Sequence, residues 1–462
     1  MAGRTATHER TTFDPGTPAP AAHVATAATT PAVATVVPLV AVACAAAWIV
    51  LFYPGFMSPD SAEQLSQART GLLSDWHSPI MALLWMATEH LVAGSAGMLV
   101  LHVALFWAGL ALLARRIDAP PWVQAAFLIV LACTPPLLSL AGAIWKDVLL
   151  ASLATLAFGV AGRSALFWPV ALLATMSRHN AIPAIAVAVL LHLAPHGPSL
   201  RALANALVAS AVLLALSLAL NASVVQTRTT PVQMIALADL NGIAARTGDM
   251  PAVDECHHMT SAEPPARAVA TGDPKVAAAL ARNRLRFDFC FDATASQTLL
   301  GQWTTLVAAH PLAYADVRAT MASRLLGFRE TPGNFMMAQS NYDPTNLGIE
   351  PPVAASPLQM RFGEWLWRLQ MQGVFRPWIY GVLVVAAAVV ATRRRRWWPC
   401  AIALSGIAFE LALFLVAPSP DYRYSYWMIV AAMISAAWLL AETIGGAARR
   451  AMRAHAGERR AA

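Results

Sequence analysis

Long apolar runs alternate with short polar stretches along most of the chain. Several runs hold about 20 residues, the length that an α-helix needs to cross the ~30 Å hydrocarbon core of a bilayer. The period-two alternation of barrel strands is absent from the sequence, and lipid accepts only helices or closed barrels as spanning structures. The pattern therefore predicts helical spans at 32–53, 96–113, 121–141, 145–162, two across 165–195, 202–220, 375–392, 397–417 and 424–442.

Arginine clusters between the runs predict how the spans are oriented. Loops that stay in the cytoplasm carry an excess of Lys and Arg, so we place each short cluster inside. Ten crossings with both ends inside satisfy every cluster, whereas nine or eleven do not. This count requires that 79–92, which carries Glu89 and His90, lies at the membrane surface, and that 165–195 breaks on the outer side. The clusters are Arg115–Arg116, Arg163, Arg201, Arg393–Arg396 and, in the tail, Arg449, Arg450, Arg453, Arg459 and Arg460.

The same pattern divides the chain into five parts and predicts an all-α polytopic membrane protein. About ten transmembrane helices flank one extracytoplasmic segment of about 150 residues, enough for a small and mainly helical domain. The parts are a disordered cytoplasmic N-terminus at 1–31, a transmembrane module of about seven helices at 32–220 whose first outer loop and surface helices cover 54–95, the soluble segment at 221–374, the C-terminal spans at 375–442, and a basic cytoplasmic tail at 443–462.

The predicted soluble segment holds helical stretches at 276–287 and 300–328 and Pro-rich turns at 344–357. It also holds Cys256 and Cys290. The chain has no C-x-x-C spacing, which excludes redox and zinc-ribbon motifs. A disulfide between the two cysteines requires an oxidising compartment, and the sequence leaves that pairing open.

Composition agrees with a lipid environment. Of the 462 residues, 58% are hydrophobic and 12% are charged, whereas a globular domain carries about 25% charged residues. The net charge of +7 lies mostly in clusters beside apolar runs. These clusters are not interleaved with the stacking aromatics of a nucleic-acid platform. We therefore expect membrane lipid as a partner and no nucleic acid.

Four polar motifs on the predicted outer side carry the candidate chemistry, because ionisable residues at membrane boundaries are costly and often functional. In the first motif, Asp60 begins a short helix, and Gln64 and Gln67 share its face. Asp60 can be an N-cap, with Glu63 completing a capping box. It can also be an acid that takes a proton from an attacking hydroxyl. The two roles are compatible in one residue.

The other three motifs combine acids, bases and aromatic rings. The tryptophan beside His77 can be an interfacial anchor. Lys146 and Asp147 can pair with each other, or hold a phosphate and a hydroxyl. Arg178 and Arg423 can grip a phosphate or diphosphate bidentately, or snorkel to lipid headgroups. The second motif is Asp75-Trp76-His77-Ser78-Pro79, the third is Trp145-Lys146-Asp147, and the fourth combines Ser177-Arg178-His179-Asn180 with Asp421-Tyr422-Arg423-Tyr424.

The order and predicted topology of these motifs resemble the GT-C superfamily of membrane glycosyltransferases. That group includes protein O-mannosyltransferases and the aminoarabinose transferases that modify lipid A. Its members carry an acid after span one, an H-P motif opening a surface helix, a second acidic motif, and a basic residue in a broken helix. The similar positions here are Asp60, His77-Ser78-Pro79, Lys146-Asp147 and Ser177–Asn180, with Tyr422-Arg423-Tyr424 like a late R-Y motif, and Trp303, His310-Pro311, Tyr314 and Arg318 like a stretch of uncharacterised bacterial members.

The resemblance covers residues 35 to 225 best, and two departures limit it. Ser78 splits the family's His-Pro pair, which leaves the role of His77 open. The first loop offers Asp60 alone at the matching position, not a D-x-D or D-E pair. The resemblance therefore implies no cofactor, although it leaves a divalent metal open.

The resemblance implies a glycosyltransferase of a bacterial inner membrane that acts at the periplasmic face. A hexosyl or pentosyl group would move, with inversion, from a polyprenyl-phosphate donor to a glycan, lipid or protein acceptor. Asp60 would be the general base, and Lys146, Arg178 and Arg423 would stabilise the leaving phosphate. The further residues expected to bind substrate are Gln64, Gln67, His77, Asp147, His179, Asn180 and Tyr422.

Two alternatives stand beside this hypothesis. A transporter or lipid flippase would need ionisable or broken helices near the bilayer midplane and two related halves, and the sequence shows no matching halves. A scaffold or sensor with an outer ligand domain predicts that the polar motifs scatter in space. Convergence of Asp60, Asp147, Arg178 and Arg423 around one cavity would instead favour the enzyme.

Overall fold

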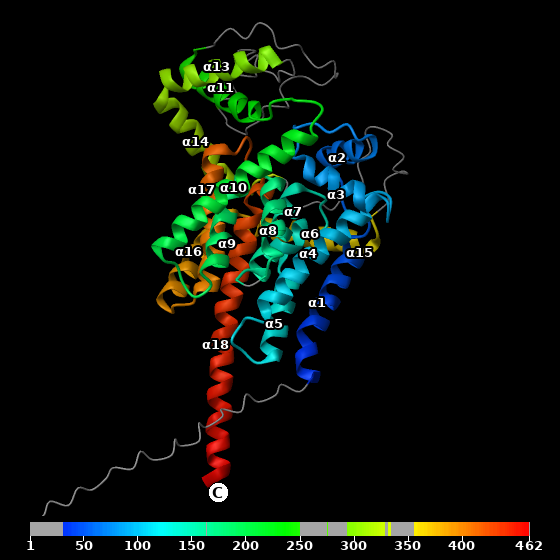
Figure 1. Ribbon diagram of the computed structural model, residues 1–462, viewed down its shortest axis with the longest axis vertical. Coiled ribbons are helices and arrows are strands. Elements are labelled where there is room, and N and C mark those ends of the chain that lie inside the picture. The colour runs from blue at the N-terminus through cyan, green and yellow to red at the C-terminus, as the bar shows by residue number, and fades with distance from the viewer. Residues whose placement is uncertain are drawn as a thin grey trace, which may run out of the picture.

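The computed structural model describes residues 31–162, 164–249, 275, 293–328, 331–333 and 355–461. Within these ranges the secondary structure is helical, and β-pairing is limited to isolated bridges. Long helices form a bundle, and three shorter helices, α11 (Gln233–Thr247), α13 (Ala293–Ala309) and α14 (Pro311–Leu325), lie together at one end of it (Figure 1). The predicted all-α class is confirmed for the described part of the chain.

The helices that could cross a membrane match most of the predicted spans. Five of the described helices are long and apolar enough for this. Two more, α8 (Phe167–Ser177) and α9 (Ile182–Leu193), are apolar but shorter and meet at the predicted break. The predicted count of ten crossings stays a prediction. The five are α1 (Pro31–Phe52), α4 (Ala96–Ala114), α10 (Leu200–Val224), α17 (Trp397–Val416) and α18 (Tyr426–Ala461).

Two predicted spans differ from straight, full-length helices. The stretch 121–141 is a pair, α5 (Pro121–Ala132) and α6 (Pro135–Ala141), bent by 60°. Proline at the start of α6 explains the break, because it lacks the N–H that a continuous helix needs. The stretch 145–162 becomes α7 (Lys146–Val160), which has 15 residues and is about 22 Å long. It is shorter than the ~30 Å hydrocarbon core.

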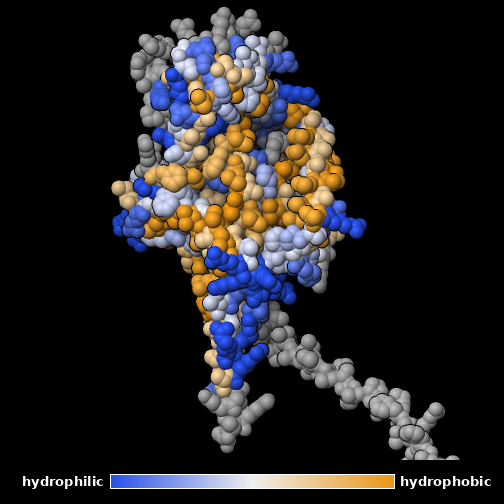
Figure 2. Space-filling view, turned by 90° about the vertical axis from the view of Figure 1, so that its left-hand side faces the viewer, coloured by the Kyte–Doolittle hydropathy of each residue, from blue (hydrophilic) through white to orange (hydrophobic). Residues whose placement is uncertain are grey.

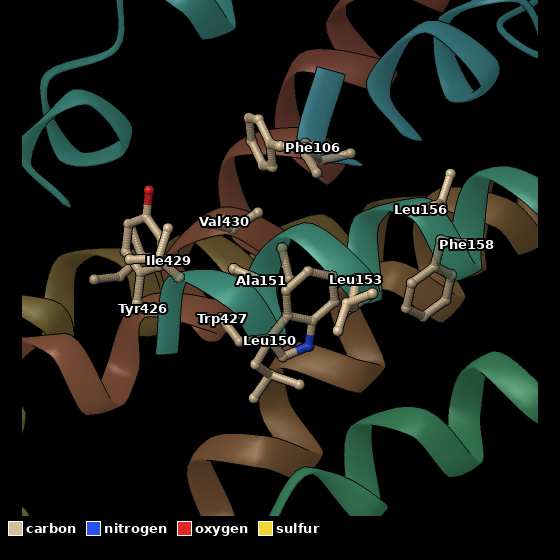
Figure 3. Packing of buried hydrophobic residues seen from close by; sticks show 14 of the residues in the cluster. Phe106, Leu150, Ala151, Leu153, Leu156, Phe158, Tyr426, Trp427, Ile429 and Val430 are labelled. Atoms are coloured by element: carbon tan, nitrogen blue, oxygen red, sulfur yellow. The ribbon is translucent and has the colours of Figure 1, made fainter. Parts of the chain in front are cut away.

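Helix α7 forms the centre of the bundle. Every residue from Asp147 to Val160 is buried. Its backbone touches that of α4 because glycines meet there: a Cβ on Gly109 would lie 2.6 Å from the backbone nitrogen of Leu156. Figure 3 shows side chains of α4, α7 and α18 packed together, with the rings of Phe158 and Trp427 stacked at 5.9 Å between centroids. This close packing fixes the start of α7, where the third polar motif lies.

Basic residues gather at the end of the bundle opposite to α11, α13 and α14. Arg394 donates to Thr443 Oγ1, and Arg449 pairs with Asp118 at 3.0 Å. The guanidinium of Arg116 lies over Trp398. Figure 2 shows a hydrophobic band across the middle of one face of the molecule, with hydrophilic residues above and below it. The molecule is therefore an α-helical membrane protein in its surface pattern, and this end is called the basic end below.

Four further helices belong to the described chain. The first outer loop contains α2 (Pro59–Thr70) and α3 (Pro79–Glu89), and the spans near the C-terminus include α16 (Pro377–Arg393), which is apolar but shorter than a full span. Helix α15 (Pro357–Met371) packs against the bundle core. Helix α18 does not stop at 442 but continues through the basic tail (Figure 1).

The predicted soluble segment is described only in part. Helices α11, α13 and α14 share a small core of their own, built on residues such as Leu240 and Leu299. The predicted stretch 300–328 is helical, with a break at His310 that the following proline explains. The remaining expectations lie outside the described residues: the disordered stretch 1–30, the helix at 276–287, Cys256 and Cys290, and most of the turns at 344–357.

Candidate functional site

The loop after α1 is joined to the segment before α7, and this brings the first and third motifs together. The backbone N–H of Phe56 donates to the carbonyl of Gly142, and that of Ile144 donates to the carbonyl of Phe56. Ser61 Oγ also donates to the Ile144 carbonyl at 2.7 Å. These bonds place the first turn of α2, with Asp60, beside the N-terminus of α7.

Asp60 is not the N-cap of α2. Ser58 occupies that position, and its N–H donates to Ser61 Oγ at 3.2 Å. The helix begins one residue before Asp60 because Pro59 has the φ of a first helical position. The predicted capping box of Asp60 and Glu63 is therefore wrong, and the carboxylate of Asp60 is available for another contact.

That contact is an ion pair with Arg423, which lies in the 3-10 turn η3 (Tyr422–Ser425) between α17 and α18. Arg423 Nη1 donates to Asp60 Oδ2 at 2.6 Å, and the two side chains are 13% and 31% exposed. Asp421 Oδ2 lies 3.6 Å from Arg423 Nε. The guanidinium also lies 4.8 Å from the centre of the Trp145 ring. The last motif thus meets the first across 363 positions of sequence.

The electrostatic surroundings keep Asp60 ionised. Burial alone would raise the pKa of this carboxyl group. The neighbouring Arg423, with His77 and Lys146, outweighs burial and holds the pKa of Asp60 well below its usual range. Asp60 is accordingly a carboxylate that an arginine already occupies, and a carboxylate with so low a pKa is a weak base.

The fourth motif reaches the same place through Arg178. This residue ends α8 in an extended conformation, just before the short 3-10 turn η1 (His179–Ala181). It forms an ion pair with Asp147, and its Nε donates to Asn180 Oδ1 at 3.1 Å. Its guanidinium lies 4.8 Å from the centre of the Tyr424 ring, which also faces Arg423 at 5.3 Å. One aromatic ring therefore lies against both arginines.

The second motif holds Lys146. His77 Nδ1 lies 3.1 Å from Lys146 Nζ, and His77 Nε2 lies 3.4 Å from Glu63 Oε2. Glu63 is 43% exposed and accepts a hydrogen bond from Gln67. The hydroxyl of Ser78 donates to the Met176 carbonyl and ties the start of α3 to α8. The serine that separates His77 from the proline is thus part of the packing between these helices.

Three cations from three distant segments of the chain therefore lie in one cluster. They are Lys146, Arg178 and Arg423, and each contacts a partner within the cluster. We call this the polar-motif cluster: Asp60, Glu63, His77, Trp145, Lys146, Asp147, Arg178, Asn180, Asp421, Arg423 and Tyr424. Among the residues that the structure describes, no group of three or more His, Cys, Asp or Glu side chains is placed to hold a metal ion.

Several predicted site residues have other roles. Gln64 is buried and donates to the backbone carbonyl of Asp60, and Gln67 donates to Glu63 and Ser74. Both amides share the face of Asp60, but their hydrogen bonds are made to residues of the first outer loop. Tyr422 is fully buried and meets Phe375 edge-on, so it belongs to the core. His179 begins η1, and its side chain lies outside the described residues.

Some residues of the cluster are absent from the sequence-based set. Trp145 donates from Nε1 to Ser58 Oγ at 2.8 Å and lies under Arg423. Tyr424 and Asp421 flank Arg423, and Glu63 holds His77. All four stand within the polar motifs, so proximity in sequence was the available signal. Trp145 and Glu63 contact residues of other segments, Arg423 and His77, which a single sequence does not reveal.

Asp75 and the W…H-P…Y…R stretch have structural roles. Asp75 Oδ1 accepts hydrogen bonds from the backbone and the hydroxyl of Thr229, which join the first loop to the segment after α10. The small core of α11, α13 and α14 is called the second core below. There, Arg318 Nη2 donates to Asp239 Oδ2 at 2.5 Å, and Trp303 Nε1 donates to the same oxygen at 3.0 Å. Arg318 Nη1 donates to the Ala417 carbonyl, at the end of α17.

Comparison with known proteins gives no relative. No family model matches the chain, and neither the curated proteins nor the solved structures contain a match. The function has to be argued from the geometry of the polar-motif cluster.

Proposed function

We propose that the chain is a membrane glycosyltransferase that moves a sugar, with inversion, from a polyprenyl-phosphate donor to an acceptor. The proposed setting is a bacterial inner membrane, with the polar-motif cluster at its periplasmic face. One observation carries the proposal: Asp60 contacts Arg423 at 2.6 Å, and Lys146 and Arg178 lie in the same cluster. An acid and three cations are the groups that such a transfer needs.

The cations suit the phosphate of the donor. Arginine presents paired N–H groups that fit phosphate oxygens, and lysine adds a compact charge. Negative charge develops on the phosphate as the sugar leaves, and cations fixed in advance stabilise that charge. In this proposal the phosphate binds among Lys146, Arg178 and Arg423, close to the surface of the apolar bundle that would hold the prenyl chain.

Asp60 would act as general base on the acceptor. The acceptor oxygen forms a bond to the anomeric carbon while its proton passes to Asp60. The bond between that carbon and the phosphate oxygen breaks, and the oxygen keeps the electron pair. Attack from the face opposite to the phosphate inverts the anomeric centre. The step needs Asp60 within hydrogen-bond distance of the acceptor hydroxyl.

The ion pair seen in the structure implies an exchange of partners. While Arg423 holds Asp60, the carboxylate is a weak base. A bound phosphate competes for Arg423, which lets the pKa of Asp60 rise toward its ordinary range. Asp60 would thus become an effective base only when the donor is present. This order limits proton transfer to the complex that can react.

The test is transfer of a labelled sugar from a synthetic polyprenyl-phosphate donor by the purified protein in lipid. Asp60→Asn should lower the rate by about 10²- to 10⁴-fold, the usual contribution of a general base. Asp118→Asn, the same change at the basic end, should leave the rate unaltered. Near-normal transfer by Asp60→Asn would overturn the assignment. Movement of the donor across the bilayer without any transfer would support the transporter alternative.

A further inference from the structure

Helix α15 (Pro357–Met371) carries large apolar side chains on its outer surface as well as on its inner one. Its inner face is ordinary: Leu366 is fully buried and Phe362 packs on the bundle core. Its outer surface is unusual, because a helix that faces water is expected to carry polar side chains on that side. The exposed fractions range from 41% to 81% for Leu358, Met360, Trp365, Trp367 and Met371.

The start of α15 is fixed to the end of α1, a candidate membrane span. Gln359 Nε2 donates to the carbonyl of Leu51 at 3.0 Å and to that of Tyr53 at 2.9 Å. Phe362 meets Phe52 edge-on at 5.6 Å between ring centres. Figure 1 shows α15 lying across this end of α1. It therefore lies at the level where the apolar part of α1 ends.

The exposed residues fall into sectors around the helix. At 100° per residue, Met360, Trp367 and Met371 lie within one narrow sector. Leu358 and Trp365 lie on the other flank, where Trp365 leans on the Phe362 ring at 5.6 Å between centres. The charged residues Arg361, Glu364 and Arg368 form a ridge between the two flanks. The helix thus has one exposed apolar flank beside a charged ridge.

We propose that α15 lies in the membrane interface, with Met360, Trp367 and Met371 among the lipid acyl chains. Arg361 and Arg368 then reach lipid phosphates, as arginine does at the edge of a bilayer. Tryptophan is typical of this depth, and amphipathic helices with this composition lie in the interface plane. Lipid is the occupant because the start of α15 is fixed to the end of α1, and the α1 side chains Val42 and Val50 are themselves exposed and apolar.

Collision accessibility of nitroxide labels tests this placement in the full chain reconstituted in phospholipid nanodiscs. Labels are introduced in a background without the five native cysteines, at Met360→Cys, Met371→Cys and Glu364→Cys. Val42→Cys on α1 and Leu312→Cys on α14 are the lipid and water references, since both positions are exposed. We expect Met360 and Met371 to favour oxygen over a nickel chelate, as Val42 does. Glu364 should resemble Leu312.

Equal access of nickel chelate at Met360, Met371 and Leu312 would overturn the proposal, and protection from both probes would assign the flank to a protein partner instead. A second measurement avoids cysteine replacement. The native chain is reconstituted with a phospholipid that carries a diazirine on its acyl chain, irradiated and digested. Adducts are expected on peptides of α1 and α15 and not on α14. Adducts on α1 alone would contradict the placement of α15.

Discussion

Two carboxylate–guanidinium pairs of nearly equal length differ in what surrounds them. Asp60 and Arg423 meet at 2.6 Å in the polar-motif cluster, and Asp239 and Arg318 meet at 2.5 Å in the second core. The first pair is partly exposed, whereas both side chains of the second are buried. Distance alone would give them the same role, and their surroundings give them different ones.

The pKa of each acid shows the difference. Burial raises the pKa of Asp239 to about 6, although Arg318 and Trp303 act against this. Arg318 also donates to the Ala417 carbonyl, so its guanidinium is divided between this carbonyl and the carboxyl group of Asp239. At Asp60 the cations outweigh burial and lower the pKa. A pair that is partly open to solvent and rich in cations can exchange partners with a ligand, whereas a buried pair holds two elements together.

Of the two arginines in these pairs, Arg423 should have the larger effect on activity when it is removed. Arg423→Ala takes away a donor to the leaving phosphate, and loss of one such donor costs about 10²- to 10³-fold in kcat. The kcat for transfer from a polyprenyl-phosphate donor is the measurement. Arg423→Lys keeps the charge and should recover part of the rate. Arg394→Ala at the basic end is the matched control, and an equal loss there would point to damage of the fold.

The same change in the second pair should act on stability. Arg318→Met leaves Asp239 buried without its partner, and removal of one member of a buried ion pair costs about 3–5 kcal/mol. Thermal unfolding in detergent, followed by proteolysis of the α11–α14 region, measures the loss. The double variant Arg318→Met with Asp239→Leu should restore most of the stability, since no buried charge remains. Failure of the double variant to recover would contradict this account.

The sequence predicted the elements of the cluster better than their contacts. Apolar run length and arginine clusters located α1, α4, α10 and α17 within a few residues, because these signals are local and strong. The break at Arg178 was likewise visible. Asp60, Asp147, Arg178 and Arg423 do lie in one cluster. The cavity that the enzyme hypothesis also requires stays a prediction.

The sequence did not show which contacts the polar side chains make. Gln64 and Gln67 make hydrogen bonds within the first loop, and Tyr422 lies in the core, so their place in the substrate site stays a prediction. The capping box was misplaced because Pro59 begins the helix. A proline bends the 121–141 span, and central burial accompanies a short α7. The periodicity of apolar residues locates a helix, but it does not show which residue a polar side chain will contact.

The two pairs should respond to pH with opposite signs. The pKa of Asp239 is raised on folding from its ordinary value to about 6, so between these two pH values the folded state binds a proton that the unfolded state has lost. Stability from this group is present below about pH 4 and is lost as pH rises to about 6. The pKa of Asp60 is lowered, so its stability is present above about pH 4 and is lost as pH falls.

Amide hydrogen exchange measured from pH 4 to pH 7, after correction for the intrinsic rate, separates the two pairs. Protection of α11 and α14 should decrease toward pH 6 by on the order of 1–3 kcal/mol. Protection of α2 should not decrease over this range. Asp239→Asn should abolish the slope in α11 and leave α2 as it was. A slope in α11 that persists in this variant would assign it to another group.

The smallest effect is expected at the exposed edge of the cluster. Glu63 Oε2 lies 3.4 Å from His77 Nε2, and His77 in turn faces Lys146, so Glu63 positions the lysine through the imidazole ring. A glutamine at this position still offers an oxygen to His77 Nε2, and Glu63 is 43% exposed. Solvent therefore weakens the contribution of its charge.

Glu63→Gln should raise KM for the donor by about two- to fivefold at nearly constant kcat, because an exposed charged contact contributes only about 0.2–1 kcal/mol. Glu364→Gln on α15 is the control. A fall in kcat as large as that of Arg423→Ala would instead place Glu63 in direct contact with the reacting atoms.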